Sequence, residues 1–148
     1  MESLSRAGLS PADRELVAIA RELLEARAVP GRHEVAAALR TTSGAVYRGL
    51  HVESSIGRAS ICAEGAAMGA AAVAGDIAID TIVAVLRTAD GGWRVISPCG
   101  VCRELIADYA PDAQVIDYDA ARAPAGPVRK VAIRTLLPGH TTRRWGGA

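Results

Sequence analysis

The chain of 148 residues contains no phenylalanine, and Trp and Tyr supply only 3% aromatic residues. A pocket that stacks a planar ring must therefore use Tyr, Trp, His or an aliphatic side chain. An excess of charge of one sign is also missing, because 17 basic residues stand against 16 acidic ones. Binding to nucleic-acid phosphates needs clustered Lys and Arg, and no block of like charge is longer than that in the tail TTRRWGGA, so we expect no nucleic-acid partner.

Long apolar stretches are absent as well. No window approaches 18 uninterrupted apolar residues, and the segment MESLSRAGLSPADREL has no apolar core of signal-peptide length, so we expect a soluble, cytoplasmic protein with no membrane partner. Cysteine is scarce and odd in number, three in all, and in the cytoplasm these thiols should stay reduced. The length fits one domain, residues 1–148, which can bury about two thirds of its unfolded surface without disulfides.

Helical and strand patterns alternate along the chain. Ser10 as N-cap, Pro11 in the first turn and Asp13 as the partner in a capping box predict a helix that ends near Ala28. Residues 34–53 predict two strands around a Ser-Gly turn. Further elements are expected as helices at about 60–75 and 99–110, a turn at 89–93, strands at 78–88, 113–118 and 128–133, a loop at 119–127 and a helical turn at 134–139. This order predicts an α/β layered domain around one sheet of about five strands.

All three cysteines fall at predicted helix N-termini. Cys62 opens the second helix, and Cys99 and Cys102 occupy the first turn of the third. Helix N-termini carry unpaired N–H groups and partial positive charge, which favour thiolates. Because two such termini can lie side by side beyond the strand ends of an α/β sheet, the three thiolates are able to converge on one metal ion.

Three interpretations of the cysteines stay open on the residues alone. The C-x-x-C spacing is typical of a redox pair, but that leaves Cys62 and Glu64 without a role. A closed structural zinc site needs a fourth ligand, for which His51 or His33 is available. An open zinc site with three protein ligands and a water is favoured by Glu64, since a nearby carboxylate can take and return a proton. The plainer interpretation of Glu64 is an acidic residue placed by the helix dipole.

The motifs C-A-E at residues 62–64 and P-C-G-V-C at residues 98–102 resemble the zinc motifs of the cytidine deaminase superfamily. The likeness runs from VAAAL through GLHVESSIGRASICAEGAAMGAA to ISPCGVCREL, and the tail AIRTLLPGHTTRRWGGA resembles that of blasticidin-S deaminases. The resemblance implies a three-layer fold with helices on both faces of a mixed sheet, a Zn²⁺ cofactor and a homotetramer. It implies hydrolytic deamination of a cytosine nucleoside or related aminoheterocycle. The alternatives are a blasticidin-S-type antibiotic deaminase and a catalytically idle, zinc-stabilised binding module.

The resemblance also assigns site residues. They are Glu64 as the catalytic acid and base, and Cys62, Cys99 and Cys102 as the zinc ligands. By similarity, the backbone N–H of Ala63 and the carbonyl of Ser97 hold the edge of the base. Cytidine deaminases commonly carry an Arg directly after the catalytic Glu, which offsets the thiolate charge. Here that position is Gly65, and Arg103 is the nearest candidate for the task.

The departures from the family pattern concern the substrate. Where members that read ribose carry Asn-x-Glu-Asn, residues 51–54 are His-Val-Glu-Ser, so that Glu53 keeps its match and His51 replaces an Asn. His33 stands where a Phe usually flanks the base. We predict substrate-binding roles for all three residues, and the two histidines have a plainer alternative as hydrogen-bonded strand residues. Plain cytidine is therefore expected to be a poor substrate.

Two residues near the C-terminus complete the candidates. Trp145 is predicted to close a substrate pocket, with an ordinary terminal position as the alternative. His140 lies among Pro and Gly, and we expect a solvated loop residue there.

Overall fold

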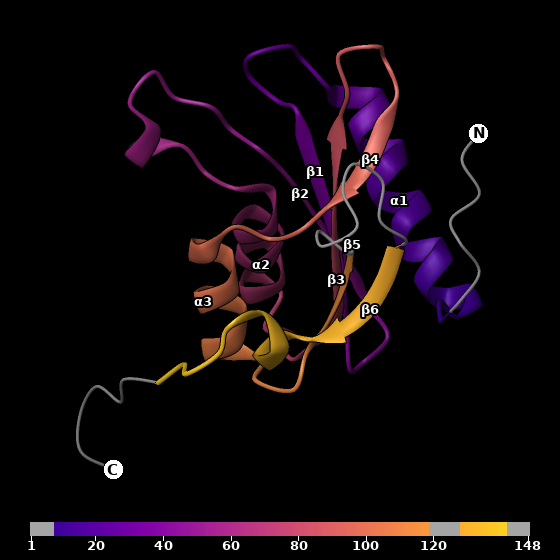
Figure 1. Ribbon diagram of the computed structural model, residues 1–148, viewed down its shortest axis with the longest axis vertical. Coiled ribbons are helices and arrows are strands. Elements are labelled where there is room, and N and C mark those ends of the chain that lie inside the picture. Colours follow the sequence, from indigo (N-terminus) through magenta and orange to yellow (C-terminus); the bar gives the residue numbers. More distant parts are fainter. Residues whose placement is uncertain (1–7, 119–127, 142–148) are drawn as a thin grey trace.

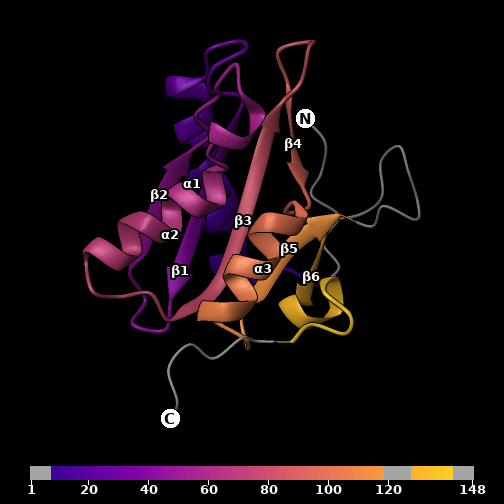
Figure 2. The same cartoon turned by 90° about the vertical axis from the view of Figure 1, so that its left-hand side faces the viewer.

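A mixed sheet with helices on both faces makes up the part of the chain that the computed structural model describes, residues 8–118 and 128–141. The strand order is β2-β1-β3-β5-β6, with β4 paired to β3 outside this path. Helix α1 covers one face, and α2 and α3 cover the other (Figures 1 and 2), which confirms the predicted three-layer α/β fold. The elements are α1 (Pro11–Arg27), β1 (Val35–Thr41), β2 (Val46–Leu50), η1 (Gly57–Ala59), α2 (Ala63–Val73), β3 (Ile79–Arg87), β4 (Trp93–Ile96), α3 (Gly100–Tyr109), β5 (Gln114–Tyr118), β6 (Val128–Ala132) and η3 (Ile133–Leu136).

Strand β4 is the element that the sequence pattern did not predict, so the sheet of the described residues has six strands where about five were expected. It pairs antiparallel with the second half of β3, from Ala84 to Arg87, while β5 pairs in parallel with Thr81–Val83 on the first half. Because β5 occupies the rest of that edge, the chain leaves the sheet after Ile96 and runs directly into the loop that opens α3.

Helix α2 begins later than expected, at Ala63 instead of near Ser60. The preceding segment stays extended because Val52 and Ile61 exchange two backbone hydrogen bonds, of 3.0 and 2.9 Å. Cys62 is consequently the N-cap of α2, and Glu64 lies in its first turn.

The close approach of α2 to β2 depends on Gly49. A Cβ at this position would lie 2.2 Å from both the Ala63 oxygen and the Ala67 nitrogen, distances that real Cβ atoms do not adopt. Glycine in a strand interior often marks such an approach of another backbone. The first turn of α2 therefore rests directly on the backbone of β2.

Two apolar layers hold the helices on the sheet. The layer under α1 is built from Leu16, Val17, Leu24, Val83, Val85 and Ile116. The layer under α2 and α3 is built from Leu39, Met68, Ile82, Ile106, Val115 and Ile133. Burial of apolar surface contributes about 25 cal/mol per Å², so these layers are the main stabilising term of the fold. The buried residues of both layers are non-aromatic, while Tyr47 and Trp93 pack against them as partly buried residues. Among the described residues, no helix is both long and apolar enough to cross a membrane.

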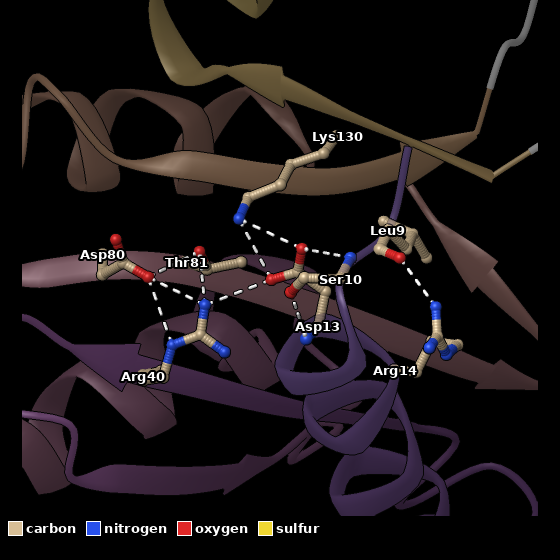
Figure 3. A network of polar contacts seen from close by, with 8 residues as sticks. All are labelled: Leu9, Ser10, Asp13, Arg14, Arg40, Asp80, Thr81 and Lys130. Carbon is tan, nitrogen blue, oxygen red and sulfur yellow. Dashed lines mark hydrogen bonds and ion pairs between the residues drawn. The ribbon is translucent and has the colours of Figure 1, made fainter. Parts of the chain in front are cut away.

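A network of charged side chains fixes the start of α1 on the sheet (Figure 3). The predicted capping box is present, since Ser10 and Asp13 exchange side-chain to backbone hydrogen bonds of 3.1 Å. The carboxylate of Asp13 is 1% exposed and also accepts from Lys130 at 3.0 Å and from Arg40 at 3.1 Å. Arg40 further donates to Asp80 at 2.9 Å. The network joins α1, β1, β3 and β6.

Candidate metal centre and active site

The three cysteines converge at the N-termini of α2 and α3. Cys62 and Cys99 are the N-caps of these helices, and Cys102 lies in the first turn of α3. Their sulfur atoms all lie within 4.8 Å of one another, with 3.5 Å between those of Cys62 and Cys99. Tetrahedral zinc with bonds of about 2.3 Å to sulfur separates its thiolates by about 3.8 Å. The three residues fit a zinc ion.

The arrangement favours an open metal site over the two other interpretations. All three cysteines are free thiols, and Cys62 takes part in the cluster together with the C-x-x-C pair, which a redox pair does not require. Among the described residues, the candidate metal ligands are three cysteines and no histidine. The histidines considered as a fourth ligand have other partners. Nδ1 of His33 lies 2.8 Å from the carbonyl oxygen of His51, and Nε2 of His51 lies 2.6 Å from Glu53.

Glu64 lies against this cluster. Its side chain is 5% exposed, and its Oε2 is 3.8 Å from the sulfur of Cys102. Burial raises the pKa of Glu64, and this effect outweighs its own backbone hydrogen bond, the contact with Cys102 and the nearby His51, which act to lower it. A buried carboxylate with a raised pKa next to a metal site is suited to take up a proton and release it again.

The pKa values of the three thiols are not all shifted in the same direction. Burial raises the pKa of Cys102, and the nearby Glu64 carboxylate adds to the effect. Burial also raises the pKa of Cys62. It acts in the same direction on Cys99, but hydrogen bonds from the backbone N–H of Cys102 and from the neighbouring thiols lower the pKa of Cys99 overall. Since thiolates are the zinc-binding form, metal binding at such a site is coupled to the release of protons.

His51, Glu53 and Ser60 form a hydrogen-bonded group beside Cys62. Nδ1 of His51 accepts from the backbone N–H of Glu34 at 3.4 Å, so its proton is on Nε2 and is donated to Oε2 of Glu53 at 2.6 Å. The other carboxylate oxygen of Glu53 accepts from the Ser60 hydroxyl at 3.1 Å. Each carboxylate oxygen of Glu53 therefore accepts one hydrogen bond within this group.

His33 is hydrogen-bonded to the backbone of His51. Its Nδ1 donates to the carbonyl oxygen of His51 at 2.8 Å, and its backbone forms a bridge with Val29. This contact agrees with the plainer interpretation of His33, and a role beside the base stays a prediction.

The two residues expected to hold the base edge are close to the cysteines along the chain. Ala63 is the first residue of α2, where the N–H groups have no partner within the helix. Ser97 lies in the loop between β4 and α3, two residues before Cys99. Arg103 donates to the Ser97 hydroxyl at 3.0 Å and to the carbonyls of Pro98 and Leu136 at 2.8 and 3.1 Å. Trp145 lies outside the described residues.

Some contacts near the site follow no local sequence pattern, and one residue differs from its expected environment. The role of Ser60 gave no signal in the sequence, whereas Gly49, a glycine inside a strand pattern, was a signal for close backbone approach. His140 lies in a loop, as expected, but the expectation that it is solvated was wrong. Its side chain is 17% exposed and contacts Glu104 at 3.0 Å and Asp108 at 3.5 Å, because the segment after η3 packs back onto α3.

The fold and the site define an α/β protein with three converging thiols that fit a metal ion and a buried glutamate, at paired helix N-termini. A family model described as the cytidine and deoxycytidylate deaminase zinc-binding region matches residues 10–117, and the chain therefore belongs to this family of zinc-binding deaminases.

Individual relatives agree with this assignment. A blasticidin-S deaminase from Bacillus cereus is 41% identical over 140 residues, which cover 91% of this chain and 96% of the relative. A cytidine deaminase from Halalkalibacterium halodurans is 30% identical over 134 residues, covering 88% and 95%. The crystal structure of a cytidine deaminase from Burkholderia pseudomallei matches with a TM-score of 0.70 and 28% identity, covering 90% of this chain and all of that one.

Proposed function

We propose that this protein, acting as a single domain of residues 1–148, hydrolytically deaminates a cytosine nucleoside or a related aminoheterocycle and releases ammonia. The observation that carries the proposal is the buried carboxylate of Glu64 beside three converging thiols. A structural zinc site has no need of such a group, whereas a hydrolytic site needs a base next to its metal. A small free molecule is the substrate, and no nucleic acid takes part.

Cys62, Cys99 and Cys102 would hold zinc as a resident cofactor. When bound, zinc acts as a Lewis acid and lowers the pKa of a water molecule to about 7. The free thiols of the cluster support a cytoplasmic location, where cysteines stay reduced.

Glu64 moves the protons of the reaction. Its carboxylate takes a proton from the attacking water while the water oxygen bonds to the ring carbon that bears the amino group, and the double bond from this carbon to the ring nitrogen opens as that nitrogen takes the proton from Glu64. Glu64 then takes the second proton of the added hydroxyl and gives it to the amino nitrogen. The bond between the carbon and the amino nitrogen breaks, a carbonyl forms, and ammonia leaves. Burial of Glu64 keeps bulk water from competing for that proton. The N–H of Ala63 and the carbonyl of Ser97 would orient the base edge.

Blasticidin S is the second candidate substrate. It is supported by the 41% identity with a blasticidin-S deaminase, against 30% with a cytidine deaminase over a similar length. The site adds a physical reason, since the N–H of His51 is used on Glu53 and does not replace the donor that an Asn would offer to a ribose. A lost hydrogen-bond partner reduces binding by about 1–3 kcal/mol, so cytidine is expected to be a poor substrate.

An ammonia-release assay tests the proposal and separates the candidates. The panel contains cytidine, deoxycytidine, blasticidin S and free cytosine, with protein of measured zinc content. We expect close to one zinc per chain, release of ammonia from at least one member and loss of activity on chelation. Zinc without ammonia from any member would indicate an idle binding module. A Cys99–Cys102 disulfide in zinc-free protein would indicate a redox pair. Efficient turnover of cytidine above all others would remove the blasticidin-S candidate.

The assembly that we propose is a homotetramer with pockets completed by neighbouring chains. It is supported by the outward side of α2, where only small or aliphatic residues are exposed from residue 65 to 73. The exposed residues of this side are Gly69, Ala70, Ala72 and Val73, of which Val73 is 91% exposed.

A further inference from the structure

Arg103 connects three segments around the metal centre. It lies on α3 directly after Cys102, its Nε donates back to the carbonyl of Pro98 at 2.8 Å, and its Nη2 donates to the hydroxyl of Ser97 at 3.0 Å. Its Nη1 donates to the carbonyl of Leu136 in η3 at 3.1 Å. Each nitrogen of the guanidinium thus has an oxygen partner.

Two of these partners, the Ser97 hydroxyl and the Pro98 carbonyl, belong to the loop 97–99 that precedes α3. The loop 97–99 leaves the sheet after β4 and enters α3, so the Pro98 carbonyl belongs neither to a strand nor to the helix. Pro98 is buried, and a buried carbonyl without a partner costs free energy. The planar fork of an arginine can bond several oxygens in fixed directions, which the single ammonium of a lysine cannot do.

We propose that Arg103 is a positioning residue that sets the loop 97–99, and through it the Ser97 carbonyl and the Cys99 thiolate, by the geometry of its three hydrogen bonds. This differs from an offset of the thiolate charge, which any cation at this place would provide. The part that concerns the Ser97 carbonyl rests on the proposed deaminase function, and the part that concerns Cys99 does not.

Arg103→Lys and Arg103→Gln separate geometry from charge, because Lys keeps the charge and loses the fork. The first readout is the rate at which a coloured chelator takes zinc from the protein, which requires no substrate. Changes next to metal ligands commonly alter affinity or activity by roughly 10- to 100-fold. We expect both variants to release zinc about tenfold faster, and Ser97→Ala, which removes one bond and leaves Arg103 intact, to change the rate in the same direction by less.

The matched control is Arg134→Lys, since Arg134 also bonds a backbone carbonyl, that of Pro111 at 2.9 Å, but on the exposed surface. Its zinc release should equal that of the unaltered protein. Zinc release by Arg103→Lys at the unaltered rate, with faster release by Arg103→Gln, would overturn the proposal in favour of charge offset. An unaltered rate of zinc release in all variants would also overturn the proposal, because neither the geometry nor the charge of Arg103 would then affect the metal centre.

The second readout uses whichever panel substrate is turned over. In zinc-saturated Arg103→Lys, a displaced Ser97 carbonyl should raise KM about tenfold with a smaller change in kcat. Unaltered KM in that variant would overturn the substrate part of the proposal. If no panel member releases ammonia with the unaltered protein, the deaminase function fails, and the zinc-release result still decides the role of Arg103 toward Cys99.

Discussion

Two buried carboxylates in this protein have opposite pKa shifts, and the difference follows from their neighbours. Burial acts to raise the pKa of both. At Asp13, hydrogen bonds from Lys130, Ser10 and Arg40 outweigh burial and lower the pKa to about 2. At Glu64 the effects that lower the pKa, including the nearby His51, do not outweigh burial, and the pKa stays raised. The first carboxylate is therefore fixed as a structural anion, and the second is able to exchange a proton.

Replacement of Glu64 by Gln keeps the size of the side chain and removes its base. Loss of a general acid–base group commonly lowers turnover by roughly 10²–10⁴-fold. We expect kcat for the best panel substrate to fall by at least this range while the zinc content stays the same. Glu22→Gln, an exposed change on α1, is the control and should leave kcat unchanged. Near-normal turnover of Glu64→Gln would refute the mechanism.

How far the site residues could be predicted depended on whether their partners were close in sequence. The three cysteines predicted to bind zinc and Glu64 lie within short motifs, and the structure brings these residues together. The state of His51 was not predictable, because its tautomer is set by a backbone N–H of Glu34, which is 17 residues away. The contacts of Arg103 are of the same kind, since one partner lies 33 residues further along the chain.

At the scale of elements, the start of α2 depends on the strand it packs against. Gly49→Ala would place a methyl group within 2.2 Å of two backbone atoms of α2. Backbone atoms cannot turn aside as a side chain does, so α2 must shift. Overpacking of this kind costs typically about 1–3 kcal/mol, and the start of α2 carries Cys62 as N-cap and Glu64 in the first turn. We expect a lower urea midpoint together with weaker zinc binding.

Gly57→Ala is the control for this change. Gly57 lies in η1 with no atom within 4 Å of the added methyl and without a positive φ. Its stability and zinc affinity should match those of the unaltered protein. If Gly49→Ala and Gly57→Ala have the same urea midpoint and the same zinc affinity, the close contact between α2 and β2 is not required for stability or for zinc binding.

The elements that were predicted well are those with local signals. The capping box at Ser10 and Asp13 located the start of α1 at Pro11, and the Ser43-Gly44 turn located the hairpin of β1 and β2. β4 gave no comparable signal, since four residues are too short for a periodic pattern and its pairing with β3 is decided by the space that β5 leaves.

At the scale of the whole molecule, the Asp13 network links acid stability to the anchoring of α1. A carboxylate with a lowered pKa contributes stability that is present above its unfolded pKa of about 3.9 and is lost as the pH falls through its folded value, about 2. This shift corresponds to roughly 2–3 kcal/mol. We expect Asp13→Asn to lower the free energy of unfolding at pH 7 by about this amount, measured with urea.

The pH dependence gives the sharper comparison. Between pH 5 and pH 2 the unaltered protein should lose stability more steeply than Asp13→Asn, because the variant has no carboxylate to protonate there. Glu25→Gln is the control, since its ion pair with Arg21 is exposed and is worth only about 0.5 kcal/mol or less. Equal acid profiles of the unaltered protein and Asp13→Asn would contradict the role of the network.

The proposed homotetramer can be tested at the outward side of α2. A helix surface of Gly, Ala and Val allows close approach of another backbone, and an exposed apolar surface of this kind is commonly covered in an oligomer. Light scattering at micromolar concentration should give the mass of a tetramer. Ala70→Arg places a charge in the middle of this side and should yield smaller species, whereas Ala26→Arg, an exposed change on α1, should leave the mass unchanged. If the unaltered protein is a monomer, the tetramer is excluded. If Ala70→Arg stays a tetramer, the contact between chains lies elsewhere, because a buried, unpaired arginine would cost several kcal/mol.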